Sequence, residues 1–527
     1  MRKIYTINSI LLLAVVLFSC NDYLDEQPRK GNGIELKTFE QLEAIINART
    51  EGTDRQLNAD LNAAQLYMSD CFSLPAAWAA EADWATILGG DNTLFHLNCL
   101  QPKYTDVLDG NNTVWLLSFR NIFIANTVLV YMDKVTGGTK EQRELLAQRA
   151  HFLRAFHYYE LANCYCVPYC EANLQELGLP INTDLTYKSS YPRASLREVY
   201  EFIESELTQA LDLSIPLKEN GSRKAWRENS SAVNSFAARF YLTKGDYAKA
   251  QEFAEKALAL NADLGDFNDN TFLKEELSAI DEETKTTNWF NQSYNTNTGL
   301  LTPELQKSYY KREFSHGLTW ASPSDKFTNS FDQTYDLRYK YFYYPNYSTM
   351  AVFGFAYFYG VPETATGYTY FSDDIFESGP CTAEAILIKA EAMARQGKWS
   401  EAISYLNTQF RPYRISNDAP AEKKNLSAGN QQEAIAAILK ERMLEFPYTL
   451  RWHDIRRCNF NDDPNDDITI KRTFYELDPT GTHAPLFSGN IIEYTLGPNS
   501  NKYLYTMAIP ASEVVVSEGS IEQNKYE

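Results

Sequence analysis

The sequence lacks the features that most directly mark nucleic-acid-binding proteins and many enzymes. Its 49 Lys and Arg residues are outnumbered by 69 Asp and Glu residues, for a formal net charge of −20. Duplex binding needs a basic surface that displaces counterions, and none is present, so the composition argues against nucleic acid. The motifs H-E-x-x-H, G-x-S-x-G, G-x-x-x-x-G-K-[ST] and G-x-G-x-x-G are also absent. We therefore predict no catalytic residues. With so many acidic residues, the sequence neither shows nor excludes the carboxylate pair of a glycosidase.

Metal-binding patterns are missing as well. Only six His occur, none at metal-ligand spacing, and His151 and His157 fall inside a predicted helix, where a structural role is expected. Cys164, Cys166 and Cys170 lack paired C-x₂-C spacing, so a local disulfide or plain packing is favoured over a metal. Segments 263–270 and 461–467 are rich in oxygen ligands but lack EF-hand spacing. We predict no cofactor and solvated acidic loops, with a structural Ca²⁺ ion as the alternative.

Long hydrophobic runs are absent after the N-terminus. Residues 10–18 are apolar and follow Arg2 and Lys3, and a run of nine is too short to span a bilayer. Residues 1–19 therefore predict a secretory signal peptide. Ser19-Cys20 resembles a lipobox, so we predict lipidation of Cys20; an ordinary signal peptide is the alternative. The acidic start of segment 20–36 resembles the surface-export tether of Bacteroidetes lipoproteins, and membrane association is expected through acyl chains only.

Aromatic residues are abundant, with 35 Tyr, 29 Phe and 8 Trp, or 14% of the chain. This share exceeds the usual demand of a core, and Tyr and Trp are also typical of recognition surfaces. The composition therefore favours a binding surface rich in rings.

Helical periodicity dominates the first half of the chain. Capping boxes at Thr38 and Ser195 predict helix starts, and apolar spacing predicts helices over 115–131 and 141–165. Two later segments share one pattern, a helix, a Gly turn, an aromatic residue and a second helix with small residues, around Gly245 and Gly397. This is the pattern of a tetratricopeptide hairpin, although two unrelated hairpins would give it too.

The domain organisation follows from these patterns. We predict a mostly α fold, a tetratricopeptide-like helical scaffold carrying a large irregular insertion of loops and short strands. One domain is expected over 37–527, with scaffold at about 37–260 and 381–457, a ligand-side insertion at about 261–380, and an irregular C-terminal region at 458–527.

Six segments together resemble the SusD/RagB family, the surface glycan-binding lipoproteins of Bacteroidetes. They are the Cys20-Asn21-Asp22-Tyr23-Leu24-Asp25 start, the Trp115 to Asn126 helix, Arg149-Ala150-x-x-Leu153-Arg154-Ala155, Glu384 to Ala392, Glu441 to Arg457, and Ile509 to Tyr526. The resemblance covers nearly the whole chain. Within it, we expect Arg451, Asp454 and Arg457, near Glu445, to form ion pairs that fasten the last helices, with a role in ligand binding as the alternative.

The resemblance implies a cell-surface protein of the outer membrane. It would capture an oligosaccharide on an arc of aromatic rings and pass it to a TonB-dependent, SusC-like transporter. The matching regions offer these ligand-binding candidates: Trp78, Asp83, Trp84, Trp289, Tyr294 and Trp320. They are chosen by chemistry and location, and core packing is the alternative for each Trp. Peptide uptake in the manner of the RagB branch, a surface hydrolase and a scaffold without ligand remain the alternative functions.

Overall fold

The computed structural model describes residues 35–51, 67–73, 93–107, 114–186, 191–269, 307–310, 312–315, 322–348, 364–368, 375–477 and 487–526. Long helices form its frame, and the strands are short and paired two by two. Beyond the elements described below, the chain forms α7 (Thr93–Asn98), α14 (Asp325–Thr328), α15 (Leu337–Phe342), α19 (Ala421–Lys424), α22 (Ala511–Val516), and the 3₁₀ turns η3 (Pro102–Val107), η4 (Glu171–Asn173), η8 (Arg411–Tyr413) and η9 (Lys502–Tyr505).

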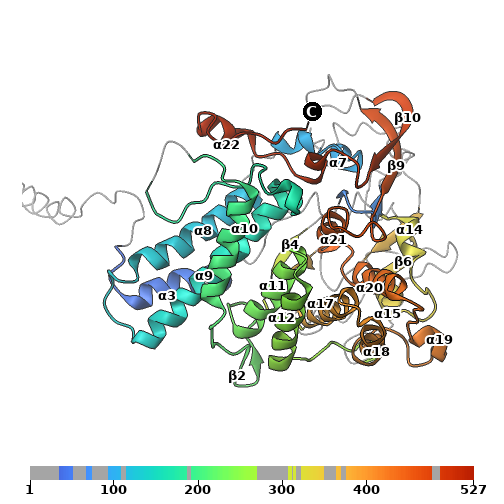
Figure 1. The fold of residues 1–527 in the computed structure, drawn as a ribbon, viewed down its shortest axis with the longest axis horizontal. Helices are drawn as coiled ribbons and strands as arrows, with labels where there is room; N and C mark the ends of the chain where they lie inside the picture. Colours follow the sequence, from blue (N-terminus) through green and yellow to red (C-terminus); the bar gives the residue numbers. More distant parts are fainter. Residues whose placement is uncertain are drawn as a thin grey trace, which may run out of the picture.

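The N-terminal part of the frame is a group of helices, α3 (Phe39–Glu51), α8 (Val114–Tyr131), α9 (Lys140–Tyr165) and α10 (Leu196–Ala210), packed against one another (Figure 1). The capping box at Ser195 is complete, and α9 has another at Thr139. At the start of α3, the Gln41 amide donates to Thr38 Oγ1 at 3.4 Å and the Thr38 amide donates to Gln41 Oε1 at 3.1 Å. The predicted helix starts are therefore confirmed, because these caps satisfy backbone donors that the first turn leaves unpaired.

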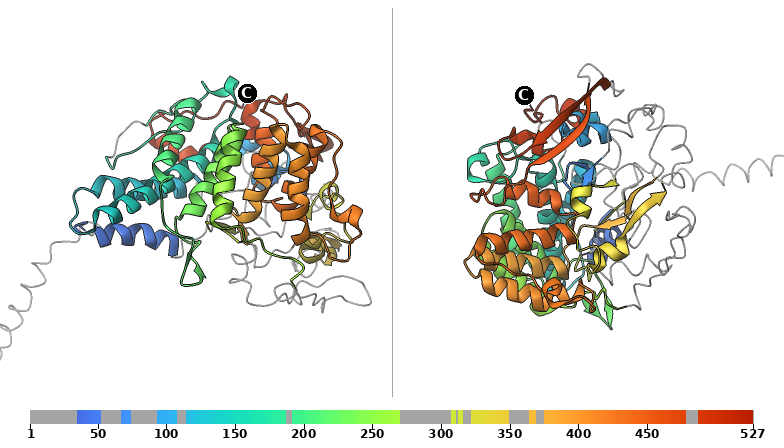
Figure 2. Two further views of the ribbon diagram at one scale, coloured as in Figure 1. Left: turned by 60° about the horizontal axis from the view of Figure 1, so that its bottom comes forward. Right: turned by 90° about the vertical axis from the view of Figure 1, so that its right-hand side faces the viewer.

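The predicted repeat is present as two stacked hairpins. Helices α11 (Ser230–Thr243) and α12 (Tyr247–Leu260) turn at Gly245, and α17 (Thr382–Arg395) and α18 (Trp399–Gln409) turn at Gly397. Both glycines have a positive φ, +74° and +86°, which L-residues with a Cβ rarely adopt. Helix α12 packs directly on α17, and α20 (Gln431–Glu445) continues the stack against α17 and α18 (Figure 2). This stacking supports the repeat interpretation over two unrelated hairpins.

Many of the aromatic residues belong to the core. Phe152 and Phe156 of α9 lie with Phe236 of α11 and with Tyr310, with ring centroids 5.2–5.7 Å apart. Other Tyr side chains are also fully buried, among them Tyr158, Tyr159, Tyr165, Tyr309, Tyr448 and Tyr505. The aromatic composition therefore reflects an aromatic-rich core to a larger extent than expected.

The described parts of the insertion contain short antiparallel pairs, as predicted. They are β4 (Glu313–Ser315) with β8 (Ile375–Glu377) and β6 (Tyr343–Ser348) with β7 (Thr364–Tyr368). A further strand of the insertion, β5 (Ser322–Pro323), pairs with β1 (Phe72–Ser73) from the N-terminal part, and β2 (Lys218–Glu219) pairs with β3 (Ser222–Arg223) outside the insertion. The strands drawn in yellow in Figure 2 lie on one side of the orange helices. The C-terminal region is less irregular than predicted, because β9 (Ile470–Leu477) and β10 (Phe487–Leu496) pair as antiparallel strands, with a shift of register between Phe487 and Ile491.

One expectation about hydrophobic runs is wrong. Helix α8 is 18 residues long with a mean hydropathy of 1.4, so by length and composition it could cross a membrane. In the folded chain its apolar side chains Trp115, Ile122 and Val128 are buried, and α8 packs against α3 and α9. Its buried Asn126 donates to the Asn182 carbonyl at 3.0 Å. These contacts make α8 a core helix of the fold.

The structure shows the state of three cysteines and the pairing of one acidic loop. Cys164, Cys166 and Cys170 carry free thiols, so the plain-packing alternative holds for them. In loop 461–467, Asp466 is paired with Arg395 and accepts hydrogen bonds from Asn461. Among the described residues, no group of three or more His, Cys, Asp or Glu is placed to hold a metal ion.

Candidate functional site

The predicted ligand-binding residues lie outside the described residues. This applies to Trp78, Asp83, Trp84, Trp289, Tyr294 and Trp320, and also to the lipidation candidate Cys20. The structure describes the framework residues at which the segments of the predicted ligand-binding residues begin and end.

The strands that flank two of the predicted segments are paired with each other. Strand β1 ends at Ser73, five residues before Trp78, and β5 begins at Ser322, two residues after Trp320. Ser73 pairs with Ser322 in an antiparallel register. Because these two serines are paired, both predicted segments join the framework at one place. A chain spans at most ~3.6 Å per residue, which limits the distance of Trp78 and Trp320 from that place. Residues that are far apart in the sequence are thus attached at neighbouring points.

A buried ion pair fixes this attachment point to the helical frame. Asp70, just before β1, accepts two hydrogen bonds of 2.7 Å from Nε and Nη2 of Arg451, at the start of α21 (Arg451–Cys458). The two side chains are only 10% and 7% exposed. Burial alone would raise the pKa of Asp70, but the Arg451 guanidinium outweighs burial and lowers it. Ser324, just after β5, donates from Oγ to the Asp70 carbonyl at 2.8 Å, which links both strands to the same residue.

A second buried cation supports the same region. Arg472 of β9 donates to the carbonyl oxygens of Ser69 at 2.5 Å and Phe72 at 3.1 Å. Burial lowers the pKa of Arg472 to about 10. Carbonyl acceptors compensate for part of the cost of burying this charge, and the guanidinium in turn holds segment 67–73 in one conformation. Neither Asp70 nor Arg472 stands in a motif that the sequence could have revealed.

Arg451, Asp454 and Arg457 form ion pairs with the predicted fastening role, but Glu445 is not a partner of these arginines. Glu445 does not bind Arg451 or Arg457; its Oε1 accepts from Arg414 Nη2 at 2.6 Å, and its Oε2 accepts from Arg338 Nη1 at 3.4 Å. Arg338 belongs to α15, within the insertion. Glu445 therefore joins the insertion to α20 and leaves Arg451 for segment 67–73.

Asp454 and Arg457, the other two residues of this prediction, belong to a buried network around Glu391 of α17. Arg457 donates to the two Glu391 oxygens at 2.5 and 2.7 Å, and Arg395 donates to Oε1 at 2.8 Å. Burial would raise the pKa of Glu391, but Arg457 and Arg395 hold it at about 2. Asp454 accepts from Arg457 at 2.8 Å and from Arg442 at 3.1 Å. The network locks α17, α20 and α21 together, which is the fastening role predicted.

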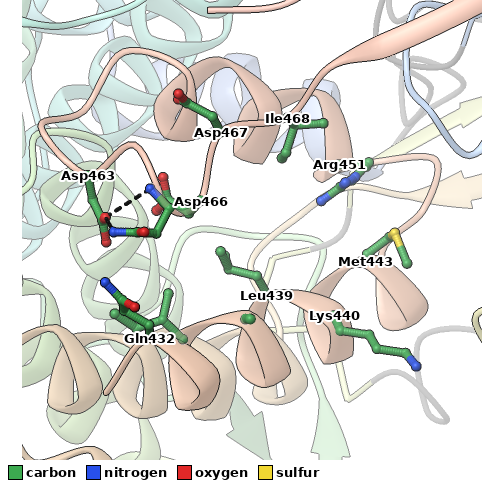
Figure 3. Close-up of a pocket in the computed structure, with 12 residues that line it drawn as sticks. Gln432, Leu439, Lys440, Met443, Arg451, Asp463, Asp466, Asp467 and Ile468 are labelled. Atoms are coloured by element: carbon green, nitrogen blue, oxygen red, sulfur yellow. Dashed lines mark hydrogen bonds between the residues drawn. The ribbon is translucent and has the colours of Figure 1, made fainter. Parts of the chain in front are cut away.

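Two hollows lie beside α20 and α21. The smaller, here the α20 groove, has a volume of about 240 Å³ and lies between α20 and residues 463–468. Figure 3 shows Leu439 pointing from α20 toward this loop, with Asp463 and Asp466 above it and Arg451 at one end. The larger, here the α21 cavity, has a volume of about 480 Å³ and is lined by parts of residues 169–171, 242–247 and 457–463 with Arg395, Gln431 and Ile435. Ile435 and Asp463 line both hollows.

Similarity to known proteins agrees with this architecture. Residues 22–242 match a SusD-like family described as starch-binding and associating with the outer membrane, and residues 380–526 match the SusD family. None of the curated proteins matches the sequence.

Solved structures share the fold at low sequence identity. A SusD superfamily protein from Bacteroides thetaiotaomicron has a TM-score of 0.62 at 14% identity, covering 93% of this chain and 100% of its own. A SusD-like carbohydrate binding protein from Bacteroides vulgatus has a TM-score of 0.59 at 18% identity, covering 92% and 97%. Surface glycan-binding protein A from Bacteroides uniformis has a TM-score of 0.58 at 15% identity, covering 93% and 100%. The two family matches together span well over half of the chain, and with this shared fold they establish that the protein belongs to the SusD/RagB family.

Proposed function

We propose that this protein captures an oligosaccharide or polysaccharide at the cell surface and delivers it to a TonB-dependent, SusC-like transporter in the outer membrane. Membership of a family described as starch-binding and outer-membrane-associated supports the ligand class and the location. The observation that carries the proposal is the β1–β5 pair, which attaches the segments of Trp78 and Trp320 to the frame at one place.

The proposed ligand face combines rings and planar polar groups. Sugars present apolar C–H faces surrounded by hydroxyls, so an indole can lie under the face while a carboxylate accepts from the edge. Trp78, Trp84, Trp289 and Trp320 supply the rings, and Asp83 and the Tyr294 hydroxyl supply the edge contacts. A rigid base increases affinity because less conformational freedom is lost on binding, and the Asp70–Arg451 pair supplies such a base.

The proposed action is binding without cleavage. Affinity raises the local concentration of glycan beside the transporter, and the lipid on Cys20 keeps the protein at the membrane. No glycosidic bond is made or broken in this scheme, so its rate depends on encounter and release.

The proposal is tested with purified residues 21–527 by calorimetry against a panel of polysaccharides and a peptide library, with chromatography of each mixture. We expect saturable binding of at least one glycan without new products. Trp320→Ala should weaken that binding while the melting temperature stays within a few degrees, and Trp226→Ala, a half-buried Trp beside the β2–β3 hairpin, serves as the matched control. Binding of peptides alone would indicate a RagB-like uptake protein, and released sugars would indicate a hydrolase.

Location and partner need separate measurements. Labelling with radioactive palmitate should mark the wild type and not Cys20→Ala. Purification from membranes should recover a large β-barrel protein together with this chain. An unlabelled, freely secreted wild type would overturn the proposed location.

A further inference from the structure

The α21 cavity is large enough for a small ligand and is built from rigid parts. Its volume of about 480 Å³ falls within the range of small-molecule sites, about 300–1,000 Å³. Its walls come from the end of α17, the α11–α12 turn, the start of α20 and the end of α21. Because the Glu391 network joins α17, α20 and α21, the walls are held in place before any ligand arrives.

Three aromatic side chains line the α21 cavity, and each packs against another side chain. The ring of Tyr169 lies 4.4 Å from that of Tyr200, and the ring of Phe460 lies 5.1 Å from that of Tyr505. The guanidinium carbon of Arg395 lies 5.3 Å from the centre of the Tyr247 ring.

The polar groups of these side chains are available. Within the described part of the chain, neither the Tyr169 nor the Tyr247 hydroxyl makes a hydrogen bond. Gln431 donates from Nε2 to the Ala394 carbonyl at 3.0 Å, while its amide oxygen accepts no hydrogen bond from any described residue. Solvent-accessible hydroxyl and amide groups beside supported rings suit a ligand that presents both hydroxyls and apolar faces.

The charges of the cavity disfavour an anionic ligand. Each of its three cations is already neutralised: Lys244 by Glu204, Arg395 by Glu391 and Asp466, and Arg457 by Glu391 and Asp454. An anion would find no unpaired cation here and would meet Asp462 and Asp463.

The cavity lies beside the α20 groove, which borders the attachment point of the proposed ligand face. Ile435 and Asp463 line both hollows, and the groove is also lined by Arg451, which holds Asp70. Arg451 and Arg457 stand near opposite ends of α21, whose eight residues rise about 12 Å. A glycan chain that contacts both ends of α21 would span about this distance.

We propose that the α21 cavity is a second saccharide-binding site, which takes a neutral sugar unit of the same glycan chain that occupies the aromatic face. This inference rests on the proposed function for the class of ligand, and it adds a separate point of contact. Two linked contacts raise the affinity for long chains above that for short ones, because the second contact forms at a high effective concentration.

Cys170 provides a direct readout, since it lines the cavity and is the only described thiol that is not buried. The native protein is treated with a thiol reagent in the presence of maltoheptaose, cellohexaose, xylohexaose or mannohexaose, with Cys170→Ser as the blank. We expect the sugar that binds in calorimetry to slow modification of Cys170.

Affinity measurements then separate the two sites. Tyr247→Phe should weaken binding about threefold to tenfold, the effect of one hydrogen bond, and Phe460→Ala about tenfold or more. Phe123→Ala removes an exposed ring of α8 outside the cavity and should leave the affinity unchanged. Trp320→Ala should weaken binding but retain sugar protection of Cys170 at high ligand concentration.

The outcomes are distinguishable. If a glycan binds but Cys170 is not protected and the Tyr247→Phe and Phe460→Ala variants bind as the wild type does, the second site is refuted and the proposed function stands. If no probe or polysaccharide binds at all, both are refuted. Melting curves of the variants close to that of the wild type confirm that these changes report on binding.

Discussion

The Asp70–Arg451 pair gives the sharpest test of how the frame supports the proposed ligand face. Replacing Arg451 with Met keeps an unbranched, largely apolar stem but leaves the Asp70 carboxylate buried without its cation. Removing one partner of a buried pair typically costs about 3–5 kcal/mol of unfolding free energy. The bidentate geometry, 2.7 Å for both hydrogen bonds, and the near-complete burial of both side chains place this pair in that class.

Chemical denaturation measures the effect, provided that the denaturant dependence m stays constant between variants. Arg197→Met is the matched control, because Arg197 forms a 3.2 Å pair with Glu171 in which the side chains are 44% and 86% exposed. An exposed pair of this kind contributes about 0–1 kcal/mol. A double-mutant cycle with Asp70→Asn should give a coupling energy of about 1–3 kcal/mol.

Equal losses in Arg451→Met and Arg197→Met, with no coupling to Asp70, would contradict this reasoning. The β1–β5 attachment point would then be held by backbone pairing and by Arg472 instead, and the ion pair would have no role in fixing it.

Further predictions concern the network, the pH response and backbone packing. Glu391→Gln should lower the free energy of unfolding by about 3–5 kcal/mol, because two buried guanidiniums lose their shared anion, whereas Glu493→Gln, in an exposed pair with a Lys, should cost about 1 kcal/mol or less. Burial lowers the pKa of His453 from 6.5 to about 3, so between these pH values the unfolded chain binds a proton that the folded chain does not. The free energy of unfolding should therefore fall as the pH drops from about 6.5 toward 3. Denaturant titrations at each pH should show a less steep fall for His453→Asn than for the wild type. Gly379→Ala should lower the melting temperature, because its Cβ would stand 1.7 Å from the carbonyl oxygen of Tyr310.

Each of these predictions has a contrary result. Equal effects of Glu391→Gln and Glu493→Gln would show that the network adds no stability. Parallel pH curves for wild type and His453→Asn would show that this histidine does not titrate differently in the two states. Gly429→Ala is the control for Gly379, since the nearest neighbour of its added Cβ is a flexible Glu433 oxygen at 3.3 Å, and equal melting of the two variants would contradict the packing argument.

The helical frame could be predicted because its signals are local. A capping box fixes a helix start within four residues, as at Ser195, and a Gly turn with small residues marks a hairpin, as at Gly245. The two hairpins share one sequence pattern and stack on each other in the structure, although the insertion separates them in the sequence. The sequence analysis missed the β9–β10 pair, because these strands are defined by their pairing with each other and not by a local sequence pattern.

The site could be predicted only in part, because its geometry depends on contacts between distant residues. Arg451, Asp454 and Arg457 form ion pairs, as predicted. The partner of Arg451 could not be predicted, because Asp70 lies 381 positions away in the sequence and no spacing pattern relates the two residues. The aromatic share of the sequence does not separate core rings such as Tyr310 from rings of a binding face. The α21 cavity brings Tyr169, Tyr247 and Phe460 together from three segments, and no motif announces this arrangement.

The most direct test of the central claim is a calorimetric titration of one glycan into the wild type and into the Trp78→Ala/Trp320→Ala double variant. We predict saturable heat for the wild type, an affinity lower by tenfold or more in the folded double variant, and an intact glycan recovered from both cells. Equal affinities in the two proteins, or a glycan recovered in fragments, would contradict the claim that rings attached at the β1–β5 pair hold a sugar polymer without cutting it.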